Sequence, residues 1–401
     1  MKVHARWRLQ PLASLVDILD SRRVPVKASD RTALDGSVPY YGATGQAGTI
    51  DRPLFNEALV LLGEDGAPFF DPTKSKAYLI DGPAWVNNHA HVLRTRDILD
   101  RRFLKYYLDV FDYRGFANGT TRLKLTQGAM RTIPVPLPDI SEQRLIVEIV
   151  ENHLSRLDST CRDLRKAQGH LTALRSSVLH LRMVGPASRL GDLRLDADYG
   201  TSTKCAYDGS GVPVLRIPNL RAGAIDTADL KFAFDTAANL SRSMVTEGDV
   251  LIVRTNGSKA LIGRSAVVSG GVKAAFASYL IRYRVDPGLL LPEWLQLSLE
   301  SPLVRAEIER LAASSAGQHN LSLSKLDGLV IPCPDLVVQG DVLSEIRDVD
   351  RQIQRTGKSL EAALMRGAAL RRGVLTAAFE GKLTGRQSDE EAIEELADDE
   401  R

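Results

Sequence analysis

The segment IPVPLPDISEQ at residues 133–143 returns as VIPCPDLVVQG at residues 330–340, and a long stretch with a heptad pattern follows each copy. Four positions of the two copies share one shift of 196 residues: Pro136, Pro138, Asp139 and Gln143 fall on Pro332, Pro334, Asp335 and Gln339. This period far exceeds the roughly 20 to 50 residues of a solenoid unit. We therefore interpret the chain as a duplicated globular domain, with one long helix after each copy.

Each long stretch has apolar residues at alternating steps of four and three, which is typical of a coiled-coil seam. The first seam is expected at Val150, Leu154, Leu157, Cys161, Leu164, Gln168, Leu171, Leu174, Val178 and Leu181. The second is expected at Val342, Ile346, Val349, Ile353, Thr356, Leu360, Ala363, Gly367, Leu370, Val374 and Ala377. Ser141 is the candidate N-cap of the first helix, while Gly185 and Gly381 are expected to end the two helices.

A helix of about 40 residues is roughly 60 Å long, and its apolar stripe must be buried. The simplest partner of each helix is the other one. Because the first helix leads from one domain into the next, we expect an antiparallel coiled coil that acts as a ruler between the domains. The alternative is a helix that packs only on its own domain. The residues expected in the seam or in partner docking are Val150, Leu157, Leu164, Leu171, Val178, Ile346, Ile353, Leu360, Leu370 and Val374.

The 401 residues exceed one hydrophobic core and favour two globular domains plus connecting helices. We place domain one at 1–140, a central helix at 141–184, domain two at 185–336, a second helix at 337–384 and an acidic tail at 385–401. No apolar stretch of membrane-spanning length and no export signal is evident, so a cytoplasmic location is expected. Cys161, Cys205 and Cys333 lack disulfide or zinc spacing and are expected to be reduced.

The formal net charge of +2 hides a strong asymmetry. Residues 388–401, SDEEAIEELADDER, contain eight acids and one arginine, a net charge of −7, so residues 1–387 carry +9. A positive body suits a polyanionic partner, although an evenly spread charge would be only a solvated surface.

Short apolar runs broken by turn residues predict strands in both domains, and hence an α+β fold with two tandem α/β domains. In domain one the runs are 58–63, 77–80 and 91–94; in domain two they are 211–219, 248–257 and 279–285. A helical segment at 294–299 matches one at 103–108. The loops differ strongly, as they would in one scaffold that presents two different recognition surfaces.

Several loops carry the residue types that contact DNA, because arginine pairs well with guanine and asparagine with adenine. In domain one the candidates are Tyr40, Tyr41, Thr44, Gln46, Lys74, Lys76, Arg122 and Lys124. In domain two they are Arg216, Asn219, Arg254, Thr255, Asn256, Ser258, Lys259, Gln318, His319 and Asn320. Each residue taken alone could equally be a turn residue or a solvated charge.

The sequence contains no complete catalytic motif. The TGKS string at 356–359 lies in the heptad seam and lacks the first glycine of a phosphate-binding loop. His89 and His91 could bind a metal, but no third ligand is evident, so a packed or DNA-facing pair is favoured. We expect a chain that binds rather than catalyses, with no metal of its own.

The repeat, the Pro-x-Pro-Asp…Gln start of each helix and the closing string AAFEGKLTG at 377–385 carry a family resemblance. With these features the chain resembles the specificity subunits of type I restriction–modification systems over nearly its whole length. One departure is GDVLS at 340–344, where the family normally continues with Glu-Gln and a basic residue.

The resemblance implies a non-catalytic DNA-binding subunit whose two globular domains are target-recognition domains. Each domain would read one half of a bipartite, asymmetric site in double-stranded DNA, and the helices would fix the spacer. The expected partners are two modification subunits and restriction subunits, which would carry S-adenosylmethionine, ATP and Mg; the chain itself would bind no cofactor and no membrane. The rival interpretations are a two-domain protein-interaction adaptor and an enzyme fused into such a frame.

Overall fold

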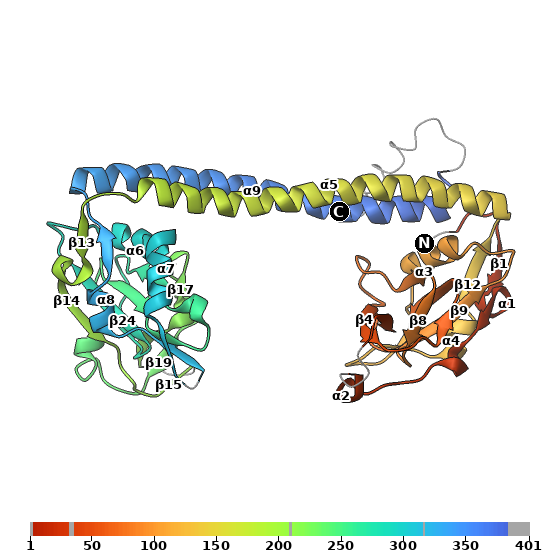
Figure 1. The fold of residues 1–401 in the computed structure, drawn as a ribbon, viewed down its shortest axis with the longest axis horizontal. Helices are drawn as coiled ribbons and strands as arrows, with labels where there is room; N and C mark the ends of the chain where they lie inside the picture. The colour runs from red at the N-terminus through yellow and green to blue at the C-terminus, as the bar shows by residue number, and fades with distance from the viewer. Residues whose placement is uncertain (1–2, 32–35, 208–210, 316, 384–401) are drawn as a thin grey trace. The chain divides into compact units, whose positions relative to one another are not determined.

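The structure, a computed structural model, describes residues 3–31, 36–207, 211–315 and 317–383. The chain forms two compact units, unit 1 with residues 1–166 and 360–401, and unit 2 with residues 167–359. The long helices α5 (Ile140–Arg182) and α9 (Leu336–Phe379) are each divided between the units (Figure 1). Each unit therefore combines one globular part with a segment of both helices. Within the described ranges, no helix has the length and apolarity of a membrane span.

The globular part of unit 1 is built from two four-stranded sheets. Its elements are β1 (Arg8–Pro11), α1 (Leu12–Leu15), β2 (Val16–Ile18), η1 (Asp20–Arg22), α2 (Ala28–Arg31), β3 (Val38–Gly42), β4 (Gly45–Ile50), β5 (Phe55–Asn56), β6 (Leu59–Gly63), β7 (Ala77–Ile80), β8 (Pro83–Val86), β9 (Ala90–Thr95), α3 (Arg101–Val110), β10 (Ala117–Asn118), β11 (Lys124–Leu125), α4 (Gln127–Arg131) and β12 (Pro134–Leu137). The strand orders are β2-β9-β6-β7 and β4-β3-β8-β5, with the pairs β1-β12 and β10-β11 beside them. The three predicted runs are β6, β7 and β9, all in the first sheet, and β6 is buried along its length.

Unit 2 follows the same plan with a larger main sheet. Its elements are β13 (Ala187–Arg189), η2 (Leu190–Leu193), β14 (Arg194–Tyr199), β15 (Cys205–Ala206), β16 (Val212–Leu215), η3 (Ile217–Asn219), β17 (Leu220–Arg221), β18 (Gly223–Ile225), β19 (Lys231–Ala233), η4 (Ser241–Ser243), β20 (Val250–Val253), β21 (Thr255–Asn256), η5 (Lys259–Leu261), β22 (Ser265–Val267), β23 (Ala275–Phe276), β24 (Leu280–Val285), α6 (Pro292–Glu300), α7 (Pro302–Leu311), β25 (Ala313–Ser315), β26 (Gln318–Asn320), α8 (Leu323–Asp327) and β27 (Val330–Pro332). The strand orders are β14-β24-β20-β22-β18-β17, β15-β19-β16-β23, β21-β26-β25 and β13-β27. Helix α6 contains the segment predicted at 294–299, as α3 contains the one at 103–108.

A buried glutamine anchors the start of each long helix in the same way. Gln143 accepts a hydrogen bond from the Asp100 backbone N–H (2.8 Å) and donates to the carbonyl oxygens of Ile98 (2.9 Å) and Pro138 (2.8 Å). Both Gln143 and its repeat equivalent, Gln339, are 0% exposed. The side chain thus ties its helix to the segment before α3.

Gln339 makes the equivalent bonds in unit 2. Its amide accepts from Leu291 N–H (2.8 Å) and donates to the carbonyl oxygens of Leu289 (2.9 Å) and Pro334 (2.7 Å), just before α6. The repeated Pro-x-Pro-Asp…Gln string therefore encodes a buried hydrogen-bonded joint.

The ends of the long helices correct one expectation. Helix α5 begins at Ile140, so Ser141 lies within its first turn, and the carbonyl oxygen of Asp139 accepts from Gln143 N–H (2.9 Å). At the start of α9, the equivalent Asp335 carboxylate accepts from Val338 N–H (2.9 Å). The aspartate, rather than Ser141, occupies the N-cap position, so the cap lies two residues earlier than the polar pattern suggested.

Helix α9 ends as predicted at a glycine. Gly381 has a φ of +72°, and the backbone N–H of Lys382 bonds to Ala377 O (2.9 Å) while that of Gly381 bonds to Ala378 O (3.3 Å). This pair of bonds is the Schellman motif.

The N-terminal segment completes unit 1. His4 N–H donates to Phe379 O (3.1 Å) at the end of α9, and β1 then pairs with β12. In unit 2 the corresponding pair is β13 and β27, but β13 follows directly after α5. Residues from both ends of the described chain thus build one unit, whereas the other unit is continuous.

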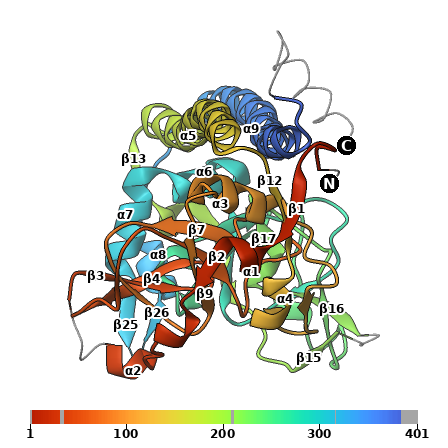
Figure 2. The same cartoon turned by 90° about the vertical axis from the view of Figure 1, so that its right-hand side faces the viewer.

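The long helices run antiparallel and side by side within each unit (Figure 2). In unit 1, Arg371 of α9 donates to Asp158 of α5 (2.6 Å), and in unit 2 Arg175 of α5 pairs with Asp350 of α9 (2.8 Å). Cys161 Sγ would lie only 2.8 Å from a Cβ placed on Gly367, so the glycine permits close contact between the helices.

The seam residues predicted for docking or packing are buried or half-buried: Val150, Leu157, Leu164, Leu171, Val178, Ile346, Ile353, Leu360, Leu370 and Val374. Leu174 and Leu181, which the heptad pattern also placed in the seam, are 50% and 69% exposed. Leu179 is buried instead at 2%, because the last turns of α5 pack against the domain as well as against α9. The simple heptad pattern fails where two surfaces share one helix.

Candidate nucleic-acid interface

The polar loops lie at the same place in both units. In unit 2, β21 follows central strand β20 and pairs with β26, with Thr255 opposite Asn320. In unit 1, the residues after β6 make the matching bridge, with Asp65 opposite Lys124. Lys124 and Asn320 are 196 positions apart, so the two ribbons are equivalent in the repeat.

Four of the residues predicted in domain two line one cavity of about 610 Å³. Arg216 comes from the segment before η3, Thr255 and Asn256 from β21, and Gln318 from β26. The rest of the lining is Ile217, Pro218, Gly257, Leu261 and Tyr279. We call this cavity the domain-two groove. The groove combines apolar side chains with amide, hydroxyl and guanidinium groups, and these polar groups come from three separate segments of the sequence.

Arg216 is held in the groove by contacts on two sides. Its Nη2 donates to the Asp229 carbonyl oxygen (3.0 Å) and pairs with the Asp229 carboxylate (3.3 Å). The guanidinium lies 5.5 Å from the centre of the Tyr207 ring, which also has the Lys231 ammonium at 4.6 Å. Tyr207 is 61% exposed, so an aromatic ring with two cations close to it faces solvent beside the groove.

Arg254, which follows β20, has a similar arrangement. Its guanidinium lies 4.5 Å from the centre of the Tyr199 ring and donates to Ser278 O (3.3 Å) and Asn320 Oδ1 (3.2 Å). Stacked rings and carbonyl oxygens fix the plane of a guanidinium, which suits a side chain that must present its edge to a ligand. Sequence reasoning missed Tyr199 and Tyr207, because only the fold brings them to the arginines.

Among the described residues, three buried polar atoms in this region lack a hydrogen-bond partner: Arg216 Nε, Arg254 Nε and His319 Nδ1. A buried polar atom without a partner costs about 1–3 kcal/mol, so such atoms concentrate where a ligand or water completes the site. Ser258, Lys259, Gln318 and Asn320 are exposed around them, and Asn256 Oδ1 accepts from Ser258 N–H (2.8 Å). The amide NH2 of Asn256 is thereby oriented by a local turn.

Asn219 does not belong to this interface. It is 1% exposed, and its amide donates to the carbonyl oxygens of Asp226 (2.9 Å) and Asp229 (2.8 Å). Its Oδ1 accepts from Arg216 N–H (2.8 Å). Asn219 is a structural residue that shapes the loop behind Arg216.

The domain-one candidates separate into buried and exposed residues. Tyr40 is 2% exposed in an apolar cluster with Ile50 and Trp85, and Lys76 is 2% exposed against the end of α3. Both were wrongly predicted as DNA contacts, since polar residue types in loops do not reveal burial. Thr44, Gln46 and Lys74 are exposed, while Tyr41 is half-buried against Tyr78.

Arg122 and Lys124 are exposed but already paired. Arg122 Nε lies 2.8 Å from Asp65 Oδ1, and Lys124 Nζ lies 3.5 Å from Glu64 Oε1. Glu64 and Asp65 occupy the positions that Arg254 and Thr255 occupy in unit 2, as the two ribbon pairings show. The two units thus carry different side chains at equivalent sites, and in unit 1 the two acids are paired with Arg122 and Lys124.

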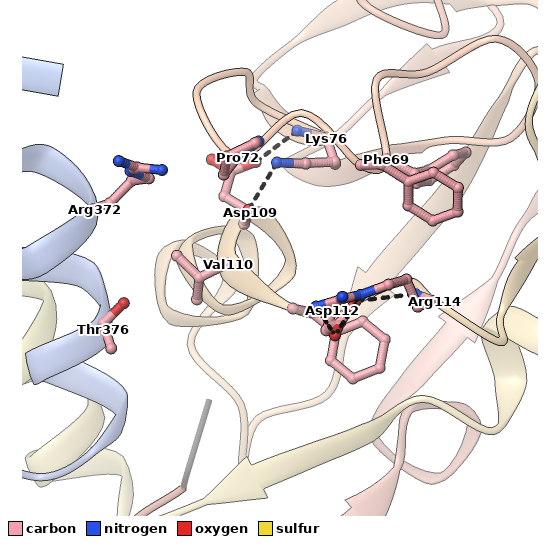
Figure 3. Close-up of a pocket in the computed structure, with 11 residues that line it drawn as sticks. Phe69, Pro72, Lys76, Asp109, Val110, Asp112, Arg114, Arg372 and Thr376 are labelled. Atoms are coloured by element: carbon pink, nitrogen blue, oxygen red, sulfur yellow. Dashed lines mark hydrogen bonds and ion pairs between the residues drawn. The ribbon is translucent and has the colours of Figure 1, made fainter. Parts of the chain in front are cut away.

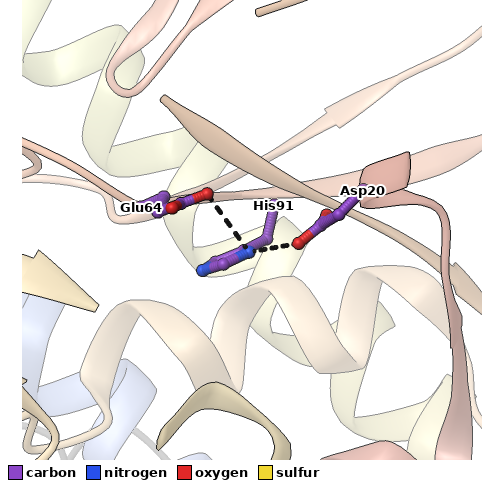
Figure 4. Close-up of side chains that lie close together, drawn as sticks. All are labelled: Asp20, Glu64 and His91. Carbon is purple, nitrogen blue, oxygen red and sulfur yellow. Dashed lines mark hydrogen bonds and ion pairs between the residues drawn. The ribbon is translucent and has the colours of Figure 1, made fainter. Parts of the chain in front are cut away.

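His91 forms a buried polar cluster beneath this ribbon (Figure 4). Its Nδ1 lies 2.6 Å from Asp20 Oδ2 and 3.6 Å from Glu64 Oε2, and its Nε2 lies 2.9 Å from Leu125 O. The ligand atoms of Asp20, Glu64 and His91 lie within 4.8 Å of one another, so candidate further ligands exist that the sequence did not reveal. His89, in contrast, is partly exposed, with Nδ1 3.5 Å from Asp65 Oδ2.

The hydrogen bonds of this cluster favour a structural role over metal binding. Both ring nitrogens of His91 already face protein oxygen atoms, and Arg23 pairs with Glu64 (2.6 Å). Burial alone would raise the pKa of Asp20. Hydrogen bonds from His91, Gln127 and the Val92 backbone N–H outweigh burial and lower that pKa. Arg23 and His91 therefore bridge the two acids, and the contact of His91 with Leu125 O ties the cluster to the Arg122–Lys124 loop.

Known proteins resemble this chain both in sequence and in fold. Residues 6–166 match the model of the type I restriction modification DNA specificity domain. The EcoKI specificity subunit of Escherichia coli K12 is 24% identical over 319 residues, which cover 73% of this chain and 68% of that protein.

Two solved structures share the fold. A chain from work on complex assembly and conformational transition of the type I R-M system has a TM-score of 0.71 at 17% identity and covers 96% of this chain and 100% of its own length. The HsdS subunit of Thermoanaerobacter tengcongensis has a TM-score of 0.54 at 18% identity, with coverages of 96% and 99%.

Proposed function

Given that the chain belongs to the specificity subunits of type I restriction–modification systems, we propose that units 1 and 2 each read one half of a bipartite, asymmetric DNA site. The chain is a DNA-recognition subunit and not a catalyst. The observation that carries the proposal is the domain-two groove, where Arg216, Asn256 and Gln318 converge from three segments. Arginine and amide side chains are those that read purine edges in the major groove.

The differences between the units support two different half-sites. The unit 2 ribbon carries Arg254 and Thr255 where the unit 1 ribbon carries Glu64 and Asp65. A carboxylate can accept a hydrogen bond from cytosine, whereas arginine prefers guanine. One scaffold with different side chains at matching positions would therefore select different bases.

We further propose that the helices serve as spacer and docking surface. The seam residues are buried or half-buried, so two modification subunits would contact exposed apolar residues instead. Leu145 (48%), Leu174 (50%), Leu181 (69%), Val337 (74%) and Met365 (75%) are available in the described helices. S-adenosylmethionine would bind to the modification subunits, and ATP and Mg to restriction subunits, where adenine methylation and DNA cleavage would take place.

Methylation mapping tests the recognition proposal. DNA from cells that express this chain with its modification subunit should contain N6-methyladenine in a motif of two short halves with a fixed gap. Cells with either subunit alone should lack it. A correctly assembled complex that leaves no bipartite motif would refute the proposal and favour the adaptor interpretation.

The spacer proposal has its own test. Insertion of about one heptad into α5 within residues 150–180, with a matching insertion in α9, should change the length of the gap and leave both half-sites unchanged. An unchanged gap in a complex that still methylates DNA would contradict the proposal that helix length sets the distance between the half-sites.

A further inference from the structure

Unit 1 also contains a cavity of about 610 Å³. It is lined by the loop before β7, the C-terminal end of α3 and the last turns of α9 (Figure 3). Phe70 and Phe111 contribute apolar surface, and Lys76, Arg114 and Arg372 contribute cationic groups. Phe70 is 50% exposed. We call this cavity the tail pocket.

The acids of the tail pocket are already used inside the domain. Asp109 accepts from the backbone N–H of Lys76 (2.7 Å) and of Ala77 (3.1 Å), and it pairs with Lys105 (2.9 Å). Asp112 pairs with Arg114 (2.8 Å). The carboxylates therefore support the fold of the pocket wall.

Lys76 is the unusual member of the set. It is 2% exposed, and its Nζ donates to the carbonyl oxygens of Asp71 (2.7 Å) and Asp109 (3.2 Å). Within the described part of the chain, Nζ has no carboxylate partner at ion-pair distance. Buried ammonium groups are normally neutralised by an anion. A buried cation at the wall of a pocket that also holds two arginines indicates an anionic occupant.

The chain itself contains an anionic segment of suitable composition. Residues 388–401, outside the described residues, carry eight acids, with Ile393 and Leu396 three positions apart as apolar groups. Helix α9 lines the pocket with Arg372 and Thr376 and leads toward this segment through Leu383. A short tether gives an effective concentration on the order of millimolar, so even a weak site would be substantially filled.

We propose that the tail pocket binds the acidic segment 388–401 of the same chain, with its carboxylates near Lys76, Arg114 and Arg372 and an apolar side chain against Phe70. The pocket contains both aromatic and cationic groups, so it suits a segment with both acidic and apolar side chains better than a ligand that carries negative charge alone. The inference concerns a site other than the DNA ribbons and does not depend on the proposed function.

Hydrogen exchange on the full-length chain tests the proposal. The wild type is compared with a full-length variant in which the eight acids of 388–401 are changed to amides. At about 20 mM salt, amides of residues 69–76 and 110–114 should exchange about tenfold more slowly in the wild type, for an effective concentration of ~1 mM and a dissociation constant of ~0.1 mM. The difference should largely vanish at about 1 M salt, where charges are screened.

Two arginines provide a matched pair of variants. Arg114 is paired with Asp112 two residues away, and Arg310 is paired with Glu307 three residues away, and both side chains are at least 70% exposed. Arg114→Glu should remove the protection, while Arg310→Glu, outside the pocket, should leave it intact. Equal exchange in wild type and neutralised tail, an equal effect of both arginine variants, or protection that requires the modification subunit would each overturn the proposal.

Discussion

Replacement of Gln143 by alanine should destabilise unit 1 specifically. The change removes three buried hydrogen bonds and leaves the Asp100 N–H and the carbonyl oxygens of Ile98 and Pro138 without protein partners. Each lost bond has a net value of about 0.5–1.5 kcal/mol, so we expect a loss of about 2–4 kcal/mol after partial access of water. Gln339→Ala should cost unit 2 a similar amount, because its three bonds are equivalent.

Hydrogen exchange measured across a denaturant series can follow the two units separately, which a single global transition cannot do. A loss of 2–4 kcal/mol corresponds to about 30-fold to 900-fold faster exchange of the protected amides in α3 for Gln143→Ala, and in α6 for Gln339→Ala. Gln318→Ala is the matched control, because this exposed glutamine belongs to the domain-two groove. A stability of Gln143→Ala within about 0.5 kcal/mol of the wild type, or an equal loosening of both units, would contradict a specific anchoring role of Gln143 in unit 1.

Three further predictions concern helix packing, pH and DNA. Gly367→Val should destabilise the helix pair by about 1–3 kcal/mol in urea unfolding, and Cys161→Ala should restore part of the loss, since Cys161 Sγ lies 2.8 Å from the added Cβ. Because the pKa of Asp20 is lowered in the folded protein, the Asp20 carboxylate stabilises the fold fully at pH values above its ordinary pKa of 3.8. This stabilisation is lost as the pH falls through the lower folded-state pKa. Thermal unfolding of Asp20→Asn should therefore lack that acid-dependent loss, and an unchanged pH profile would count against the His91 cluster. For the assembled complex, Lys259→Gln should reduce the slope of log affinity against log salt by about 1, while Lys166→Gln on α5 should not.

The repeat made the architecture predictable because its markers are structural residues. The sequence does not show that Gln143 and Gln339 form hydrogen bonds. Their shared shift of 196 residues nevertheless predicted both helix starts to within about one residue of the observed ones. The strands followed from short apolar runs such as 59–63. The closure of unit 1 by β1 could not be predicted, because pairing with β12 joins segments more than 120 residues apart without a shared motif.

The interface was predictable only as a set of loops. Arg216, Asn256 and Gln318 meet in one groove, but Asn219, three residues from Arg216, is buried. A polar side chain in a loop can either face a ligand or satisfy backbone groups beneath the loop, and sequence does not distinguish these uses. The exposed Tyr207 was missed because its place beside Arg216 is set by strand pairing.

The division of unit 1 between two distant stretches has a consequence for synthesis on the ribosome. The rings of Phe103 and Tyr107 in α3 pack against Phe379 at 5.1 and 5.3 Å, so part of their apolar cover is translated long after α3. At roughly 5–20 residues per second, the wait from residue 166 to residue 383 lasts about 10 to 40 seconds. Unit 2, which is continuous from 167 to 359, can complete its own contacts during that interval. The nascent chain would then finish its second half before its first, and would meanwhile leave uncovered the part of α3 that Phe379 later contacts.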